Sequence, residues 1–376
     1  MRVSEPQPPR AWAAIDLLRF ACAMLVVAHH YGAALPLNPN PAAAVMLAGV
    51  RLDTGWAEWT SFGWVGVELF FVISGYVIAC SAVGAAPGAF VRRRAQRLLP
   101  AAWVCATLTL AVLMAMHAGA LPVLGWQWLR SVSLWPVGRA IDPSYWTLGI
   151  ETSFYLVVAW RLRRGSGPGR IEPLAWMIGG ASLFFWATQL LNGSFDDGRM
   201  NARLLQLLLL PHGAFFALGI LLHAWHRAGP NALRAAGLVL FLGTGAVEIA
   251  AHAADSARGL NVSASPVPAL AAFALGVLAV AACRRVQPWL GWTCRWSAML
   301  GLMTYPLYLL HQQIGAAIAA AFGPGAFPAA LAVVIALSWS VVRFAEPPLR
   351  RAIGAAFSAR RGPRPDRRPT ASPSAG

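Results

Sequence analysis

Apolar stretches of about twenty residues recur along this chain of 376 residues. A stretch of that length suits an α-helix that crosses the hydrocarbon core of a bilayer. Hydrophobic residues make up 58% of the chain and charged residues only 12%, against about a quarter in soluble proteins. The residue-by-residue alternation expected of an outer-membrane barrel is absent. The sequence therefore predicts an all-α, polytopic membrane helical bundle.

We expect about ten transmembrane helices. The predicted spans are residues 14–34, 62–83, 98–118, 145–161, 172–191, 204–223, 234–252, 266–283, 298–320 and 327–345. The tryptophan-rich connector 119–144 is expected to form a short helix at the membrane interface. The spans belong to one domain, 14–350, flanked by an N-terminal segment, 1–13, and a basic tail, 351–376, whose Arg-, Pro- and Ser-rich composition predicts disorder.

The arginines predict the orientation. If the N-terminus is cytoplasmic, 22 of the 30 basic residues fall on the cytoplasmic side, and two lie within spans. The six on the outer side are Arg51, Arg130, Arg139, Arg199, Arg203 and Arg258. Such an excess follows the positive-inside rule and predicts that both termini are cytoplasmic. The net charge of +16 is thereby explained by the arginines that determine the orientation in the membrane, and we expect no nucleic-acid partner.

The first span, "IDLLRFACAMLVVAHH", contains Arg19 and His30. Eleven helical residues turn through about 1100°, so the two side chains share one helix face about 16 Å apart. Ionisable residues inside a membrane are costly, which makes both candidates for function. The alternative is structural: Arg19 would reach the cytoplasmic headgroups, and His30 would support a helix contact.

Three further ionisable residues fall at about the depth of His30, nearer the outer side: Glu68, Glu151 and His311. A carboxylate beside an imidazole can fix its tautomer and raise its basicity, so we expect Glu68 or Glu151 to orient His30 as a general base. For Glu68 the alternative is a hydrogen bond in helix packing. The sequence thus predicts a layer of proton-transfer residues.

Other residues have weaker assignments. Ser74 and Gly75 permit close helix approach, and we expect Ser74 and His311 to line a substrate pocket. His212 and Glu248 are interpreted as mostly structural. The five cysteines include no CxxC pair, so we expect reduced thiols and no metal site.

The segment "FVRRRAQRLLPAAW" places four arginines at the cytoplasmic surface: Arg92, Arg93, Arg94 and Arg97. Guanidinium groups bind phosphate oxygens in bidentate fashion, so this cluster can act as a phosphate clamp. The alternative is that these arginines only determine topology.

Six motifs in order carry a family resemblance. They are the Arg19/His30 pair, "GVELFFVISGYVI", "FVRRRAQRLLPAAW", "YWTLGIETSFYL", "TYPLYLLHQ" and "RFAEPPLR". From about residue 13 to 350 the chain resembles the acyltransferase 3 family of integral membrane O-acyltransferases, which includes O-antigen and exopolysaccharide acetyltransferases.

The resemblance implies transfer of an acyl group, commonly acetyl, to a hydroxyl of a cell-surface or lipid-linked glycan. It implies acyl-CoA (acetyl-CoA) as co-substrate with no permanently bound cofactor, and a location in the bacterial cytoplasmic (inner) membrane. Lipid, donor and glycan are the expected partners.

Within the resemblance, Arg19 and His30 match the essential pair of the family, and Glu151 matches the glutamate of its fourth-span motif. The clustered arginines cover its donor-binding positions. Two departures occur: Glu68 stands where Asp is usual, and Thr152 and Ser153 replace a Glu-Gln pair. The first retains a carboxylate, whereas the second removes one.

His30 could act as a general base or could carry the acyl group covalently. Two other functions are compatible with buried Arg, His and Glu: a transporter or flippase for a lipid-linked glycan, and a structural partner in polysaccharide export.

Overall fold

The computed structural model describes residues 12–165, 171–193, 201–263, 265–323 and 325–359, and in this part of the chain all regular structure is helical. The elements are α1 (Ala13–His29), η1 (His30–Ala34), α2 (Leu35–Leu37), α3 (Pro41–Met46), α4 (Ala57–Thr60), α5 (Val65–Ala82), α6 (Pro87–Ala115), α7 (Leu121–Val132), η2 (Pro143–Tyr145), α8 (Trp146–Arg163), α9 (Glu172–Leu191), α11 (Arg203–Leu207), α12 (Gly213–Ala228), α13 (Ala232–Leu260), α14 (Val267–Val286), η3 (Gln287–Thr293), α15 (Cys294–Phe322), α16 (Phe327–Ser340), η4 (Val341–Ala345) and α17 (Glu346–Ala359). The predicted all-α bundle is confirmed.

Within the described residues, seven helical segments are long and apolar enough to cross a membrane. They comprise α1–α2, α4–α5, α6, α9, α13, α14–η3 and α16–α17. The three remaining predicted spans fall on α8, α12 and α15. Of these, α12 has only 16 residues and is fully buried over its first twelve, whereas α8 and α15 carry polar residues at the centre of the bundle. The count of ten spans and the orientation stay predictions.

Two helices form the centre of the bundle because their backbones approach closely. Helices α5 and α12 pack side by side, and each contributes a glycine to the contact. A methyl group on Gly75 would overlap the backbone oxygen of Phe216, and one on Gly219 would overlap that of Val72. The close helix approach expected at Gly75 is therefore present, and small residues permit it as in other membrane bundles.

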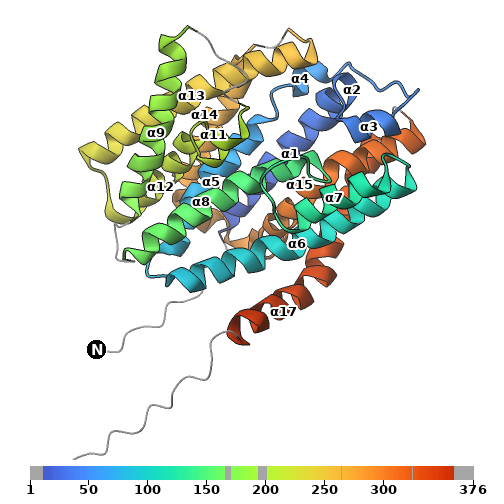
Figure 1. Ribbon diagram of the computed structural model, residues 1–376. Helices are drawn as coiled ribbons and strands as arrows, with labels where there is room; N and C mark the ends of the chain where they lie inside the picture. Colours follow the sequence, from blue (N-terminus) through green and yellow to red (C-terminus); the bar gives the residue numbers. More distant parts are fainter. Residues whose placement is uncertain (1–11, 166–170, 194–200, 264, 324, 360–376) are drawn as a thin grey trace, which may run out of the picture.

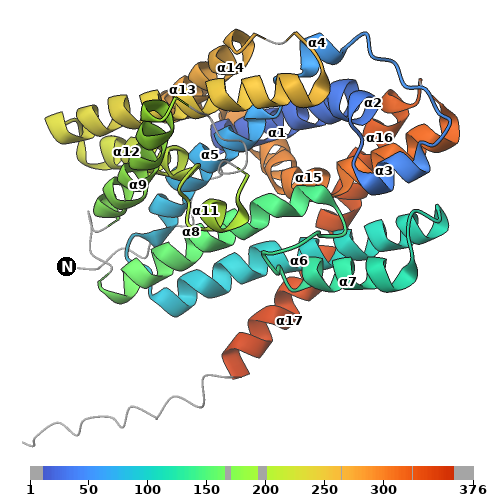
Figure 2. The ribbon, with the colours of Figure 1, turned by 45° about the horizontal axis from the view of Figure 1, so that its top comes forward.

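Helix α1 lies between α5 and α15. Gly63 and Gly66 let the start of the α5 segment approach the carbonyl groups of Leu25 and Cys22 on α1. On one side of this centre lie α9, α13 and α14; on the other lie α6, α7 and α16, while α17 projects from the bundle (Figures 1 and 2).

Two predicted elements differ from the structure. The span expected at 204–223 is broken: α11 ends at Leu207, and α12 begins at Gly213. The break includes Pro211, which has no N–H to continue a helix. At the other end of the chain, α17 extends to Ala359, beyond the predicted start of the disordered tail at residue 351; residues 360–376 lie outside the described part.

The connector 119–144 contains the expected short helix, α7. The loop that follows is anchored at its end by Asp142, which is fully buried. Its Oδ1 accepts hydrogen bonds from the Ser144 backbone N–H (2.8 Å) and hydroxyl (2.5 Å), and its Oδ2 accepts one from the Gln313 N–H on α15 (3.3 Å). The Ile141 N–H donates to Ser131 Oγ at 2.9 Å. This loop is therefore fixed to both α7 and α15.

We predict that replacing Gly219 with Ala lowers the free energy of unfolding by about 1–3 kcal/mol, because the methyl group has no space against α5. The control is Gly243→Ala on α13, where a methyl group meets nothing within 4 Å. That change should be neutral or stabilise by about 0.5–1 kcal/mol. Thermal unfolding of detergent-solubilised protein measures both, and equal unfolding temperatures would contradict the proposed packing.

The buried carboxyl of Asp142 is expected to make the stability of the fold depend on pH. Burial raises the pKa of its carboxyl from 3.8 to about 6, since desolvation outweighs the hydrogen bonds from Ser144 and Gln313. Between these two values the folded protein holds a proton that the unfolded chain releases. The carboxyl therefore favours folding at low pH, and that contribution is lost as the pH rises through about 6, on the order of 3 kcal/mol in total.

Asp142→Asn removes this titration. Its unfolding temperature, relative to that of the unsubstituted protein, should rise between pH 4 and pH 7. The same substitution at Asp53, whose carboxylate is exposed in another connector, controls for the loss of one negative charge. The prediction is wrong if the unfolding temperatures of Asp142→Asn and the unsubstituted protein differ by the same amount at every pH.

Candidate functional site

His30 lies where α1 changes its hydrogen-bonding pattern. The α-helix ends at His29, and His30 begins a single π-helical turn in which the Leu35 N–H bonds to the His30 carbonyl. Single π-turns inside α-helices are frequent at functional sites. The spacing predicted between Arg19 and His30 is unaffected, because the helix is regular up to that point.

The imidazole of His30 pairs with that of His311 on α15. His311 Nε2 lies 3.2 Å from His30 Nδ1, and the ring centroids are 4.8 Å apart. His311 is completely buried, whereas His30 is half-buried. Tyr31 supports the contact, since its hydroxyl donates to the His311 carbonyl at 3.0 Å.

Backbone carbonyls select the tautomers of both rings. His30 Nδ1 lies 2.8 Å from the Val26 oxygen, and His311 Nδ1 lies 2.8 Å from the Tyr308 oxygen. A carbonyl oxygen can only accept, so in the neutral rings each Nδ1 carries the proton. The single His30 Nδ1–H is then shared between the Val26 carbonyl and the more distant His311 Nε2, and His30 Nε2 keeps a lone pair that none of the contacts in the described structure engages. That nitrogen can take a proton.

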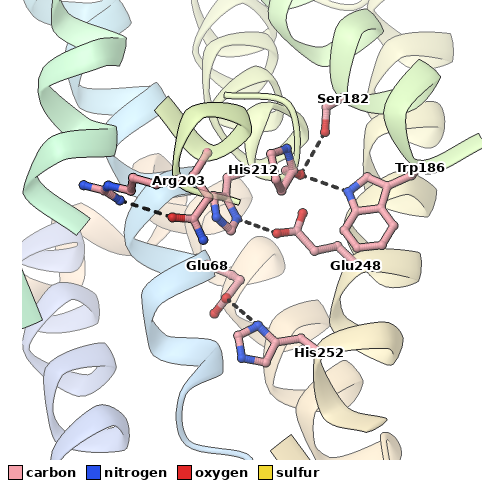
Figure 3. Close-up of polar contacts among 9 residues, drawn as sticks. Glu68, Ser182, Trp186, Arg203, His212, Glu248 and His252 are labelled. Atoms are coloured by element: carbon pink, nitrogen blue, oxygen red, sulfur yellow. Dashed lines mark hydrogen bonds and ion pairs between the residues drawn. The ribbon is translucent and has the colours of Figure 1, made fainter. Parts of the chain in front are cut away.

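Neither predicted carboxylate contacts His30. Glu68 is almost completely buried, and Figure 3 shows it beside His252 of α13, with Oε1 3.8 Å from Nδ1. Trp64 stacks on the other face of that imidazole, with ring centroids 4.1 Å apart. The expectation that Glu68 orients His30 is therefore not met, because helical depth specifies a level in the membrane but not the neighbouring helix.

A second buried pair lies next to Glu68 (Figure 3). His212 Nδ1 is 2.5 Å from Glu248 Oε1, and both residues are buried. The sequence analysis missed His252 and interpreted His212 and Glu248 as mostly structural. One signal was present: Glu248 and His252 are four residues apart in an apolar helix and thus share a face.

Glu151 lies in a small cavity of about 60 Å³ together with Arg19 and Ser74. Its Oε1 accepts a hydrogen bond from Ser74 at 3.2 Å and a short one from the Tyr155 hydroxyl. Tyr305 and Tyr308 of α15 also line this cavity. The structure thus brings Arg19, Ser74 and Glu151 together, away from the position beside His30 that was expected of Glu151.

The four clustered arginines fall into two groups with different surroundings. Arg94 lies over the Tyr155 ring at 5.7 Å and donates to Ser81 Oγ at 3.2 Å, and Arg97 interacts electrostatically with Arg19 and Tyr305. Neither residue lines the small cavity, but both lie close to it: Arg94 contacts Tyr155, which bonds Glu151, and Arg97 interacts with Arg19. Arg93 is exposed and donates to the Ser81 carbonyl at 3.2 Å, while Arg92 is half-buried.

A larger pocket of about 740 Å³ adjoins the small cavity, and Leu148 lines both. His30 of η1 and the completely buried His311 of α15, which was expected to line a substrate pocket, line neither of these two spaces. Tyr308 faces the small cavity and Gln313 the large pocket, so His311 lies between these two levels of the same helix.

The described residues contain no group of three or more His, Cys, Asp or Glu side chains arranged to hold a metal ion. Cys22, Cys80, Cys105 and Cys283 are free thiols.

Residues 12–343 match the family profile described as an acyltransferase domain. No curated protein and no solved structure matches the chain. The profile match extends over α1 to η4 and so includes both cavities and the paired histidines. The chain therefore belongs to the acyltransferase 3 family and is a multi-pass membrane acyltransferase.

Proposed function

We propose that this acyltransferase moves an acyl group, with acetyl as the expected group, from cytoplasmic acyl-CoA to a hydroxyl of a cell-surface or lipid-linked glycan. The supporting observation is the Nε2 of His30, whose lone pair no contact in the described structure engages, in a bundle that also holds a small cavity with Arg19 and Glu151 and an adjoining large pocket. The proposed location is the bacterial cytoplasmic membrane, with the arginine cluster on its inner face, as the positive-inside rule favours.

Donor binding follows from charge. Coenzyme A carries a pyrophosphate and a 3′-phosphate, which guanidinium groups bind in bidentate fashion. Arg94 and Arg97 lie close to the small cavity, and Arg19 adds a third guanidinium within it. The pantetheine arm would extend from these arginines along the small cavity and bring the thioester toward His30.

His30 would then act as the base. Its Nε2 takes the proton of the acceptor hydroxyl as the oxygen attacks the thioester carbonyl carbon. The C–S bond breaks, and the imidazolium returns the proton to the departing CoA thiolate. If His30 instead carries the acyl group, the same Nε2 attacks the thioester carbonyl carbon, the C–S bond breaks and the CoA thiolate leaves. The acceptor hydroxyl then attacks the acyl-imidazole, the C–N bond breaks and the freed Nε2 takes up the hydroxyl proton. In both routes His311 positions the ring by accepting from Nδ1–H.

Glu151 has a supporting role in this proposal. Its carboxylate, bonded by Ser74 and Tyr155, attracts the Arg19 guanidinium in the small cavity. Glu68 would act at a distance, through His252 in the wall of the large pocket.

A transporter of lipid-linked glycan is the second function considered, and the family match favours acyl transfer over it. Incubation of purified protein with radiolabelled acetyl-CoA and membrane glycan separates the two. Label that moves to glycan supports the enzyme, and glycan movement without label supports the transporter.

We predict that His30→Gln lowers acetyl transfer by a factor on the order of 10²–10⁴, because the amide cannot take a proton at Nε2. The variant should still insert and unfold at a similar temperature, since glutamine can donate to the Val26 carbonyl. The control is His117→Asn in an exposed connector, which should transfer at the normal rate. Near-normal turnover of His30→Gln would refute both roles proposed for this residue.

Arg94→Gln combined with Arg97→Gln should raise the KM for acetyl-CoA by about tenfold or more, since hydrogen bonds to charged groups contribute about 1.5–3 kcal/mol each. Arg163→Gln, at the exposed end of α8, removes a positive charge elsewhere and is the matched control. Initial rates across a range of acetyl-CoA concentrations give the answer; an unchanged KM in the double variant would exclude the phosphate clamp.

A further inference from the structure

The wall of the large pocket contains three of the arginines that the orientation places outside: Arg130, Arg139 and Arg203. Within the described residues, none of the three forms an ion pair with a carboxylate. A positive-inside protein gains nothing in topology from cations on its outer side. The three charges therefore require another explanation.

Arg203 fixes one end of this wall. It donates to the Pro136 carbonyl (2.6 Å), the Trp146 carbonyl (2.9 Å) and Gln206 Oε1 (3.2 Å). All three acceptors are uncharged, so the guanidinium is held in place while its positive charge stays uncompensated. The charge is thus part of the electrostatic field in the pocket.

Arg130 lies at the end of α7 and Arg139 in the loop that follows it, and contacts hold both segments in place. Arg130 lies over the Trp126 ring at 5.1 Å, and its buried Nε has no hydrogen-bond partner. Gly138 passes so close to this guanidinium that a methyl group there would overlap it, and its φ of 86° favours glycine. Arg139 is exposed and comes next in the same loop, which Asp142 and Arg203 anchor.

The acidic residues across the pocket are already engaged. Glu248 bonds to His212 at 2.5 Å, and Asp255 pairs with Arg258 at 3.7 Å. The wall formed by α7, its following loop and α11 is therefore the electropositive side of the pocket. An anion entering the pocket would be attracted to this side.

The remaining lining suits a sugar. Trp135, Trp146 and Tyr145 supply aromatic faces, which pack against the C–H faces of a sugar ring, and Gln127 and Gln313 supply amides that can donate to and accept from hydroxyl groups. The volume of about 740 Å³ is within the range of small-molecule sites.

We infer that the large pocket is the acceptor site and that it selects a sugar bearing a negative charge, as phosphate or carboxylate, which Arg130 and Arg139 bind. This inference rests on the proposed function and deepens it by naming the class of acceptor. Because phospholipid headgroups also present phosphate, the test must distinguish a charged sugar from a headgroup.

The experiment is saturation-transfer difference NMR on the detergent-solubilised full chain with four probes: glucose 1-phosphate, glucuronate, glucose and sn-glycerol 3-phosphate. We expect stronger transfer to one or both of the charged sugars than to glucose. Preference for the phosphate or for the uronate supports the inference and identifies the anion. The inference is overturned if saturation transfer to glucose equals saturation transfer to both charged sugars. It is also overturned if saturation transfer to glycerol 3-phosphate equals that to glucose 1-phosphate and glucuronate does not bind.

Variants locate the binding. Arg139→Gln, and its combination with Arg130→Gln, should weaken binding of the charged sugar by about tenfold or more. Arg51→Gln, an exposed arginine of another connector that lies outside this pocket, should bind normally. The single change at exposed Arg139 avoids a folding defect, and unfolding temperatures verify this. Full binding by both arginine variants overturns the assignment.

Failure of this inference is distinct from failure of the proposed function. If radiolabel from acetyl-CoA reaches uncharged glycan as readily as charged glycan, the enzyme stands and the acceptor class is wrong. If charged sugars bind as expected but no label is transferred, the pocket assignment stands and the acyl-transfer proposal fails.

Discussion

Lipid supplies no hydrogen-bond partners, so the polar groups buried in a membrane bundle are stabilised by partners within the protein. This constraint organises the interior of the chain. His30 donates to a carbonyl one turn earlier and meets His311, Glu151 accepts from Ser74 and Tyr155, and His212 pairs with Glu248. Each bond fixes a tautomer or a rotamer, so the constraint that keeps the bundle intact also prepares its reactive groups before any substrate binds.

Close backbone packing makes these bonds possible. Because Gly75 and Gly219 bring α5 and α12 into contact, Ser74, next to Gly75, is held firmly enough to meet Glu151 of α8. The same rigidity separates two spaces of different size and chemistry. A narrow cavity contains Arg19 and Glu151, and a wide pocket with aromatic and amide residues adjoins it at Leu148.

The residues that depth and charge single out do form sites in the structure, but with different partners. His311 lies against His30 as members of one layer should, whereas Glu68 contacts His252 and Glu151 faces the small cavity. A sequence gives the level of a residue in the membrane through its distance from the end of the span. The direction in which the side chain points depends on the rotation of the helix and on its neighbours, which apolar periodicity specifies poorly when a helix such as α12 is buried on all sides.

The sequence alone determined the all-α membrane bundle, the family and most helix positions, because apolar length and an ordered series of motifs are local properties. It did not show the break at Pro211, the π-turn at His30 or the grouping of Arg130, Arg139 and Arg203 around one pocket. Those features arise from contacts between segments far apart in the chain. Only the tertiary structure decides them, since packing selects among the rotations and pairings that a helical pattern leaves open.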